Sequence, residues 1–219
     1  MRKSMGVVAF LLFLAGRLWA QDADISNLLM NSSFEREGPG GSVMAWHKAG
    51  APDSTVSRVK GGAFGDHCLS MTMGRGGPYA YVQQVIPCSP RKGERYVLSA
   101  YLRSDEPIEV DLVIESYFRA LDKESTVRER FKVTEEWKRY SAERTIDLEG
   151  EGRMRVIVQV HKPDVAVYVD GVMLERKAAG DPAPYSPGVC DGPAIDDPFL
   201  PIDRVAFPSD DFDYAKYPA

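Results

Sequence analysis

The feature that most constrains the fold of this chain is an alternation of apolar and polar residues with period two. Three stretches show it: 97–103, 109–117 and 153–161. In the second stretch, for example, Val110, Leu112 and Ile114 alternate with Asp111 and Glu115. Successive side chains of a β-strand point to opposite faces, so each stretch predicts a strand with one face on a core and the other in water.

Turn-forming residues separate these stretches, and further strands fit between them. The turns are Gly76-Gly77-Pro78, Arg91-Lys92-Gly93, Glu149-Gly150-Glu151-Gly152 and Lys162-Pro163-Asp164. We expect the remaining strands at 68–73, 79–86, 128–133, 137–146 and 165–175. No stretch has the apolar spacing of an amphipathic helix of ten or more residues. This pattern predicts an all-β fold, a jelly-roll β-sandwich of two antiparallel sheets.

The two ends of the chain differ in composition from its middle. Residues 1–20 resemble a signal peptide, because Arg2 and Lys3 precede an apolar run that ends near Ala20. The run is shorter than the roughly 20 residues of a membrane span, and an uncleaved anchor is the alternative. From Gly180 onward the chain holds eight of the 15 prolines and eight Asp. We therefore expect a sandwich over 25–178 and an extended Pro/Asp-rich tail or linker over 179–219, docked in part by its apolar residues.

Charge and cysteine content limit the partners and the chemistry. The formal net charge of −5 becomes −8 if Arg2, Lys3 and Arg17 are removed with the signal peptide. This acidic balance argues against nucleic acid and against an anionic membrane surface as partners. Cys68, Cys88 and Cys190 are an odd number for an exported chain. They permit one disulfide and one free thiol, with Cys68 and Cys88 paired because they lie in or beside neighbouring predicted strands, or three buried thiols.

Seven short phrases in the right order resemble the carbohydrate-binding modules of the family 4, 9 and 22 group, with a galactose-binding-like sandwich. In chain order they are Asn31-x-x-Phe34-Glu35, Trp46, Gly65-x-x-x-Leu69, Val82-Gln-Gln-Val85, Lys92-Gly-Glu-Arg-Tyr-x-Leu-Ser-Ala100, Glu135-Glu-Trp-Lys-Arg-Tyr-Ser141 and Tyr168-Val-Asp-Gly-Val172. The resemblance covers about residues 25–178. Because Trp46 and Trp137 stand in such phrases, we expect both in the core.

The resemblance implies a structural calcium ion that ties the N-terminal segment to the last strand. The matching ligands are the Ser33 carbonyl and the carboxylates of Glu35 and Asp170, since calcium takes six to eight oxygen ligands. One departure is that Arg58 and Lys60 occupy a region where the family often supplies another acidic ligand. The alternative is that both carboxylates are only hydrogen-bonded at strand ends.

The resemblance also implies a poly- or oligosaccharide as ligand, bound on a concave sheet face. Aromatic rings stack on sugar rings, and polar side chains bond the hydroxyls. The residues that match by strand position are Tyr79, Tyr81, Glu115, Tyr117, Arg155 and Gln159. The alternative is a solvated face with an Arg155–Glu115 cross-strand pair.

The function expected from this resemblance is a secreted or periplasmic, non-catalytic binding module that could accompany a glycoside hydrolase. No membrane contact is expected after signal cleavage. One alternative is a small glycan-active enzyme, since Glu109 and Asp111 share a strand face and glycosidases need two carboxyl groups about 5–9.5 Å apart. Another is a surface or structural protein that uses the sandwich to bind a second protein.

Overall fold

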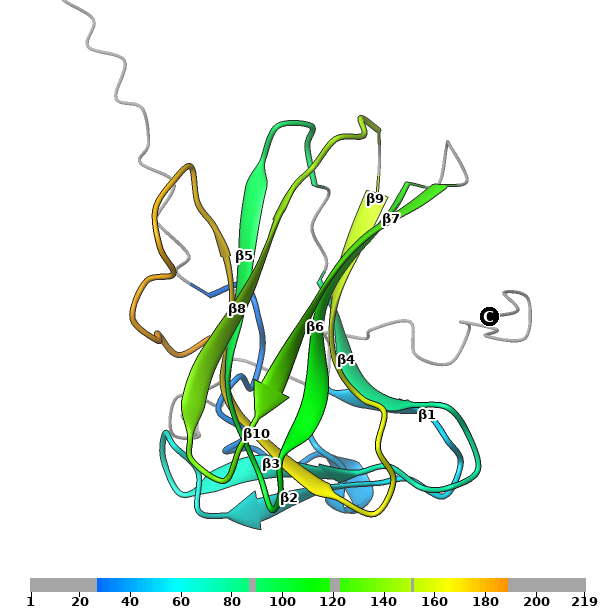
Figure 1. Cartoon of the computed structure of the whole chain (residues 1–219). Helices are drawn as coiled ribbons and strands as arrows, with labels where there is room; N and C mark the ends of the chain where they lie inside the picture. Colours follow the sequence, from blue (N-terminus) through cyan, green and yellow to red (C-terminus); the bar gives the residue numbers. More distant parts are fainter. Residues whose placement is uncertain (1–26, 87–89, 119–122, 151, 189–219) are drawn as a thin grey trace, which may run out of the picture.

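The computed structural model describes residues 27–86, 90–118, 123–150 and 152–188. These residues form two antiparallel five-stranded sheets that face each other (Figure 1). The all-β prediction is therefore confirmed. The predicted signal peptide at 1–20 and the tail beyond residue 188 lie outside the described residues. No helix in the described part of the chain has the length and apolar character needed to cross a membrane.

The strands alternate between the two sheets along much of the chain. The first sheet has the order β1 (His47–Gly50), β4 (Ala80–Ile86), β9 (Gly152–Val160), β6 (Ile108–Phe118) and β7 (Lys123–Val133). The second has the order β2 (Thr55–Lys60), β3 (His67–Thr72), β10 (Ala166–Arg176), β5 (Arg95–Ser104) and β8 (Lys138–Thr145). All eight strands expected from the alternation and the turns are present. β1, β2 and a 3-10 turn at Pro39–Gly41 were not expected.

The core lies between the sheets and consists of the apolar residues that the alternation placed on one face. It includes Leu98, Ala100 and Leu102 of β5, Val110, Leu112 and Ile114 of β6, and Met154, Val156, Val158 and Val160 of β9. Burial of apolar surface stabilises a fold by about 25 cal/mol per Å². This layer is therefore the main source of stability.

The opposite face of the first sheet is drier than the alternation predicted. Asp111, Val113 and Glu115 of β6 and Ile157 and Gln159 of β9 point away from the core, yet all are buried. These positions lie on β9 and β6, which both have a strand on either side. The long side chains of Arg155 and Arg130 contact Glu115 and Asp111. The expectation that Glu115 and Gln159 face water is therefore wrong.

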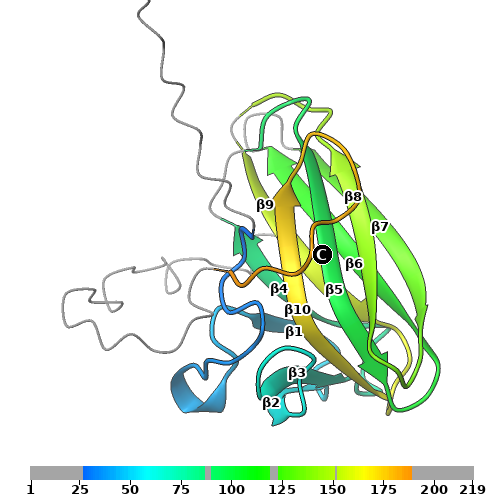
Figure 2. The same ribbon diagram turned by 90° about the vertical axis from the view of Figure 1, so that its left-hand side faces the viewer.

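The N-terminal segment attaches to both sheets. The Leu28 amide donates to the Leu174 carbonyl, and the Val172 amide donates to the Ser32 carbonyl. The buried Gln84 side chain accepts from the Met30 amide and donates to the Met30 carbonyl, at 2.8 Å in both cases. These contacts bring the Asn31-x-x-Phe34-Glu35 phrase beside the last strand, as Figure 2 shows for the blue segment and β10.

Aromatic packing completes this junction. Trp46 is buried, its ring centroid lies 5.3 Å from that of Phe34, and its Nε1 donates to the Asn31 carbonyl. Trp46 therefore belongs to the core, as expected. Past β10 the chain returns along the N-terminal segment. There the ring of Tyr185 packs on Phe64, and its hydroxyl lies 2.9 Å from the hydroxyl of Ser32. The first part of the predicted tail is thus docked.

Cys68 is a buried free thiol in this structure. Burial, with a smaller contribution from the nearby Asp170 carboxyl, raises the pKa of this thiol to about 11. Its side chain is therefore protonated at neutral pH. Cys88 and Cys190 lie outside the described residues.

Candidate functional site

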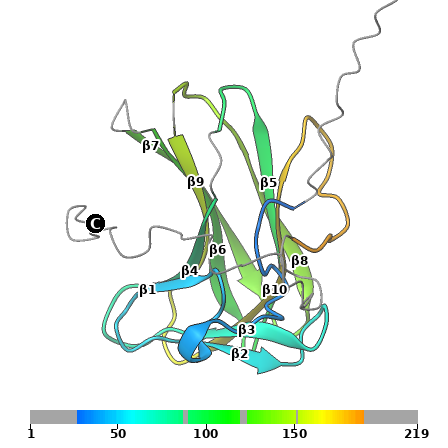
Figure 3. The same ribbon diagram turned by 180° about the vertical axis from the view of Figure 1, so that it is seen from behind.

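The six predicted ligand-binding residues lie on one face of the first sheet, the face turned away from the core. They come from β4, β9 and β6, which are adjacent, and from the turn just before β4. Tyr81 is directly opposite Gln159, and Glu115 is directly opposite Arg155. Figure 3 shows these strands from behind, with β4, β9 and β6 side by side.

Glu115 and Arg155 form an ion pair at the centre of this face. Arg155 Nη2 donates to Glu115 Oε2 at 2.7 Å, and Arg155 Nε lies 2.5 Å from Glu115 Oε1. Arg155 Nη1 also donates to Gln83 Oε1 at 3.3 Å. The Glu115 side chain is 11% exposed and that of Arg155 is 34% exposed. The cross-strand pair considered from the sequence is therefore present and partly buried.

Aromatic side chains stand at both ends of the face. The rings of Tyr79 and Tyr81 are tilted by 35° with centroids 5.9 Å apart, at the β4 side. Tyr117 lies near the end of β6, and the Cζ atom of the Arg153 guanidinium is 5.5 Å from the centroid of its ring. Between them, the outward-pointing side chains of Val113 and Ile157 form a buried apolar floor. An apolar floor with aromatic and polar groups around it is typical of a binding surface.

A second charged cluster on the same face was not selected from the sequence. Arg130 of β7 binds the fully buried Asp111 carboxylate with two bonds, Nε to Oδ1 at 2.7 Å and Nη2 to Oδ2 at 3.2 Å. His161 Nε2 lies 2.7 Å from Asp111 Oδ2, and Arg128 Nη1 lies 3.7 Å from the same oxygen. The alternation placed Asp111 on the face of Glu115, but only the β6–β7 register brings Arg130 opposite it.

The cluster holds Asp111 in its charged form. Burial by itself raises the pKa of the Asp111 carboxyl. The hydrogen bonds and charges of Arg130 and His161 outweigh burial and lower the pKa below its ordinary value. The same contacts raise the pKa of Arg130. One carboxylate thus binds an arginine and a histidine on the outer side of the sheet, with Arg128 nearby.

The two predicted metal-binding carboxylates lie elsewhere, against the loop between β2 and β3. Glu35 Oε1 accepts from the His67 amide and Asp170 Oδ2 accepts from the Phe64 amide, both at 2.8 Å. The loop approaches them closely because it contains glycine: a Cβ on Gly62 would lie 2.8 Å from Asp170 Oδ2. Burial, and to a smaller extent the charge of Glu35, raise the pKa of Asp170 to about 7.

Arg58 modifies this region. Its Nε donates to the Phe34 carbonyl and its Nη2 to the Glu35 carbonyl, both at 2.8 Å. The same guanidinium lies 4.0 Å from the Glu35 carboxylate. Across the described ranges, no three acidic, histidine or cysteine side chains converge as a metal-binding group. The oxygen donors therefore fit a calcium ion only if backbone carbonyls and water supply most of its ligands.

The outer face of the second sheet carries a different arrangement. The guanidinium of Arg103 lies 3.8 Å from the ring centroid of Tyr168 and 5.3 Å from that of Trp137. Trp137 is partly exposed, so the expectation that it belongs to the core is wrong. Trp137 stands just before β8 and contacts Arg103 on the outer side of the second sheet. Side chains on this side do not reach the core between the sheets.

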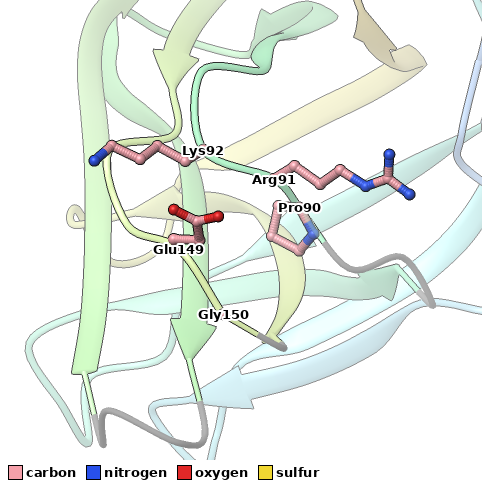
Figure 4. Close-up of a pocket in the computed structure, with 5 residues that line it drawn as sticks. All are labelled: Pro90, Arg91, Lys92, Glu149 and Gly150. Atoms are coloured by element: carbon pink, nitrogen blue, oxygen red, sulfur yellow. The ribbon is translucent and has the colours of Figure 1, made fainter.

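A pocket in the described part of the chain lies at one end of the sandwich. It is lined by Pro90, Arg91, Lys92, Glu149 and Gly150, from the turns before β5 and after β8 (Figure 4). In Figure 4 the side chains of Arg91 and Lys92 point away from each other, so these charges do not converge on a common centre.

The fold and this face define a β-sandwich binding domain. A family model described as "Carbohydrate binding domain", which covers families 4 and 9, matches residues 26–166. The chain therefore belongs to this family of carbohydrate-binding modules. No curated protein sequence matches it.

Solved structures support the fold. The CBM22-1 xylan-binding domain of Xyn10C from Paenibacillus barcinonensis is 17% identical, with a TM-score of 0.54 over 70% of this chain and 96% of that domain. A family 16 carbohydrate-binding module is 22% identical, with a TM-score of 0.51 over 68% of this chain and 99% of that one. The enzymatically active domain of tailspike protein 4 from bacteriophage CBA120 is 13% identical, with a TM-score of 0.54 over 69% of this chain and 21% of that one. At these identities the likeness concerns the fold alone.

Proposed function

We propose that this chain is a secreted, non-catalytic module that binds a soluble poly- or oligosaccharide on the outer face of the β1-β4-β9-β6-β7 sheet. The observation that carries the proposal is the combination on one face of the Tyr79–Tyr81 pair, the apolar floor of Val113 and Ile157, and the Glu115–Arg155 pair. Aromatic and apolar groups provide stacking area for sugar rings, and fixed polar groups orient the hydroxyls.

The state of the carboxylates favours binding over hydrolysis. A glycosidase needs a general acid whose pKa is raised so that it holds a proton. Asp111 has a lowered pKa and is bound by Arg130, and the Glu115 carboxylate accepts from Arg155. The acid with a raised pKa in the described part of the chain, Asp170, is fully buried on the other sheet. A catalytic partner would therefore be a separate domain or protein, such as a glycoside hydrolase.

We also propose that calcium strengthens the junction between the N-terminal segment and β10. The Ser33 carbonyl and the carboxylates of Glu35 and Asp170 would hold it. The proposal is supported by the position of the Glu35 and Asp170 carboxylates, which both lie against the loop between β2 and β3. Arg58 already compensates part of the charge of Glu35, so we expect the stabilisation to be modest.

The test is a panel of soluble glycans titrated into the purified chain, with the release of reducing ends followed in parallel. We expect binding of at least one glycan without turnover, and weaker binding by Tyr81→Ala. Tyr168→Ala, which removes a tyrosine from the other sheet, is the matched control and should bind as the parent does. Equal effects of the two variants would argue against this face, and turnover of a glycan would favour the enzyme alternative.

A further inference from the structure

Several basic side chains surround the buried Asp111 carboxylate. It faces the guanidinium of Arg130, the guanidinium of Arg128 and the imidazole of His161. Arg130 uses two of its nitrogens on Asp111, and its third, Nη1, lies 3.5 Å from the Glu109 carboxylate. Arg128 approaches Asp111 only to 3.7 Å, beyond hydrogen-bonding distance. The Arg128 and Arg130 side chains are both 48% exposed. Donor groups of this cluster therefore face solvent.

Basic residues outnumber acidic ones over the whole outer face of the sheet. The strand register places five basic residues on this face, Arg128, Arg130, Lys132, Arg153 and Arg155, and four acidic ones, Glu109, Asp111, Glu115 and Glu124. The excess is one positive charge before His47 and His161 are counted, although the formal net charge of the chain is −5. Asp111 and Glu115 are buried, so the charge presented to a ligand is more positive than the formal sum.

The position of the cluster relative to the tyrosines sets the size of a ligand that would contact both. Tyr81 of β4, Gln159 of β9, Asp111 of β6 and Arg130 of β7 lie in one row across the sheet. Three strand spacings of about 4.8 Å separate the first from the last, roughly 14 Å. A chain of sugars that stacks on Tyr81 would therefore extend across the strands toward Arg128 and Arg130.

We propose that the glycan bound on this face is acidic, and that Arg128 and Arg130 bind a uronic acid carboxylate. This inference rests on the proposed function. A guanidinium matches a carboxylate with two parallel hydrogen bonds, which gives direction as well as attraction. Asp111 and Glu109 hold Arg130 in position beside this contact. The ligand carboxylate pairs with Arg128, whose guanidinium lies beyond hydrogen-bonding distance of Asp111.

The experiment compares one polysaccharide before and after its charge is removed. Polygalacturonate and the same preparation after chemical reduction of its carboxyl groups are titrated into the full chain by calorimetry at low and high salt. We expect binding that falls with salt and with carboxyl reduction. Dextran sulfate and dextran form a second pair, which separates recognition of a carboxylate from attraction to any anionic chain.

Variants connect the effect to the cluster. Arg128→Gln should weaken binding of polygalacturonate about tenfold, and Arg128→Lys should restore part of it. The control is Arg176→Gln, which removes an arginine of similar exposure, 53%, from β10 of the other sheet. Melting curves establish that each variant is folded.

Each outcome has a definite meaning. Selective loss of binding on carboxyl reduction and in Arg128→Gln supports the inference. Equal binding of the native and the reduced polysaccharide, equal effects of Arg128→Gln and Arg176→Gln, or equal binding of dextran sulfate and polygalacturonate overturns it, and the proposed function stands. If neither polygalacturonate nor its reduced form binds, the inference is overturned, while the proposed function is decided by the panel of soluble glycans.

Discussion

The ion pair between Glu115 and Arg155 should contribute more to stability than an exposed pair, because it is partly buried. Removing one partner of a fully buried pair costs about 3–5 kcal/mol, while exposed pairs contribute about 0–1 kcal/mol. The Glu115 side chain is 11% exposed and that of Arg155 is 34% exposed. Glu115→Gln should therefore lower the free energy of unfolding by about 1.5–3 kcal/mol, since it leaves the Arg155 charge without its carboxylate.

A double-mutant cycle isolates the pair. Glu115→Gln, Arg155→Gln and the double variant are unfolded in urea, and the free energies of unfolding are compared at a constant m-value. We expect a coupling energy of about 1–2 kcal/mol. The control cycle uses Glu106 and Lys162, whose oxygen and nitrogen lie 2.8 Å apart but whose side chains are 57% and 48% exposed. Its coupling should stay below about 0.5 kcal/mol.

The burial argument is refuted if the two cycles give the same coupling energy. It is also refuted if Glu115→Gln is as stable as the parent chain. In either case desolvation of the two charges would offset their attraction, and the pair would be retained for a reason other than stability.

Three further predictions concern the core, the N-terminal junction and the region of Asp170. Leu112→Ala should lower the free energy of unfolding by about 2–5 kcal/mol in urea, since Leu112 is fully buried between the sheets; a smaller loss would mean that the sheets close over the cavity. Gln84→Ala should cost about 1–3 kcal/mol and speed amide exchange at Met30, because Gln84 makes both hydrogen bonds to that residue; unchanged exchange would show that the segment is held by other contacts. In chelator, Asp170 binds its proton more tightly in the folded than in the unfolded chain, because burial raises its pKa from 3.8 to about 7. Its contribution is therefore fully present below pH 4 and is lost as the pH rises through 7. The melting temperature should fall between about pH 4 and pH 7, calcium should reduce the fall, and Asp170→Asn should abolish both effects; identical curves with and without calcium would dispose of the metal site.

The sequence predicted the strands of this fold better than it predicted which side chains are dry. Alternation in 97–103, 109–117 and 153–161 depends only on local chain geometry, so the strands and their core faces followed directly. The burial of Glu115 and Gln159 depends on the strands that flank them and on the long side chains those strands carry. Neither is visible in a single stretch of sequence.

The same distinction applies to the candidate site. The shared face of Tyr81, Glu115 and Arg155 followed from strand order in a resembling family. The contact of Arg130 with Asp111 required the exact register of β6 and β7, which the sequence does not give. β1 and β2 were missed because they are short or largely exposed, so that little apolar periodicity marks them. Trp137 was misplaced because its position in a phrase that resembles the family does not determine which face of the sheet it lies on.

The position of β7 at the free edge of its sheet has a consequence for the solution behaviour of the chain. An edge strand exposes unpaired amide and carbonyl groups that can pair with an edge of another molecule, and charged side chains oppose such pairing. Four of the five residues from Arg128 to Lys132 are charged, with only Phe131 between them. Arg128 and Arg130 therefore also protect the domain from edge-to-edge aggregation. A variant in which both are neutral should be examined for self-association before any loss of binding is interpreted.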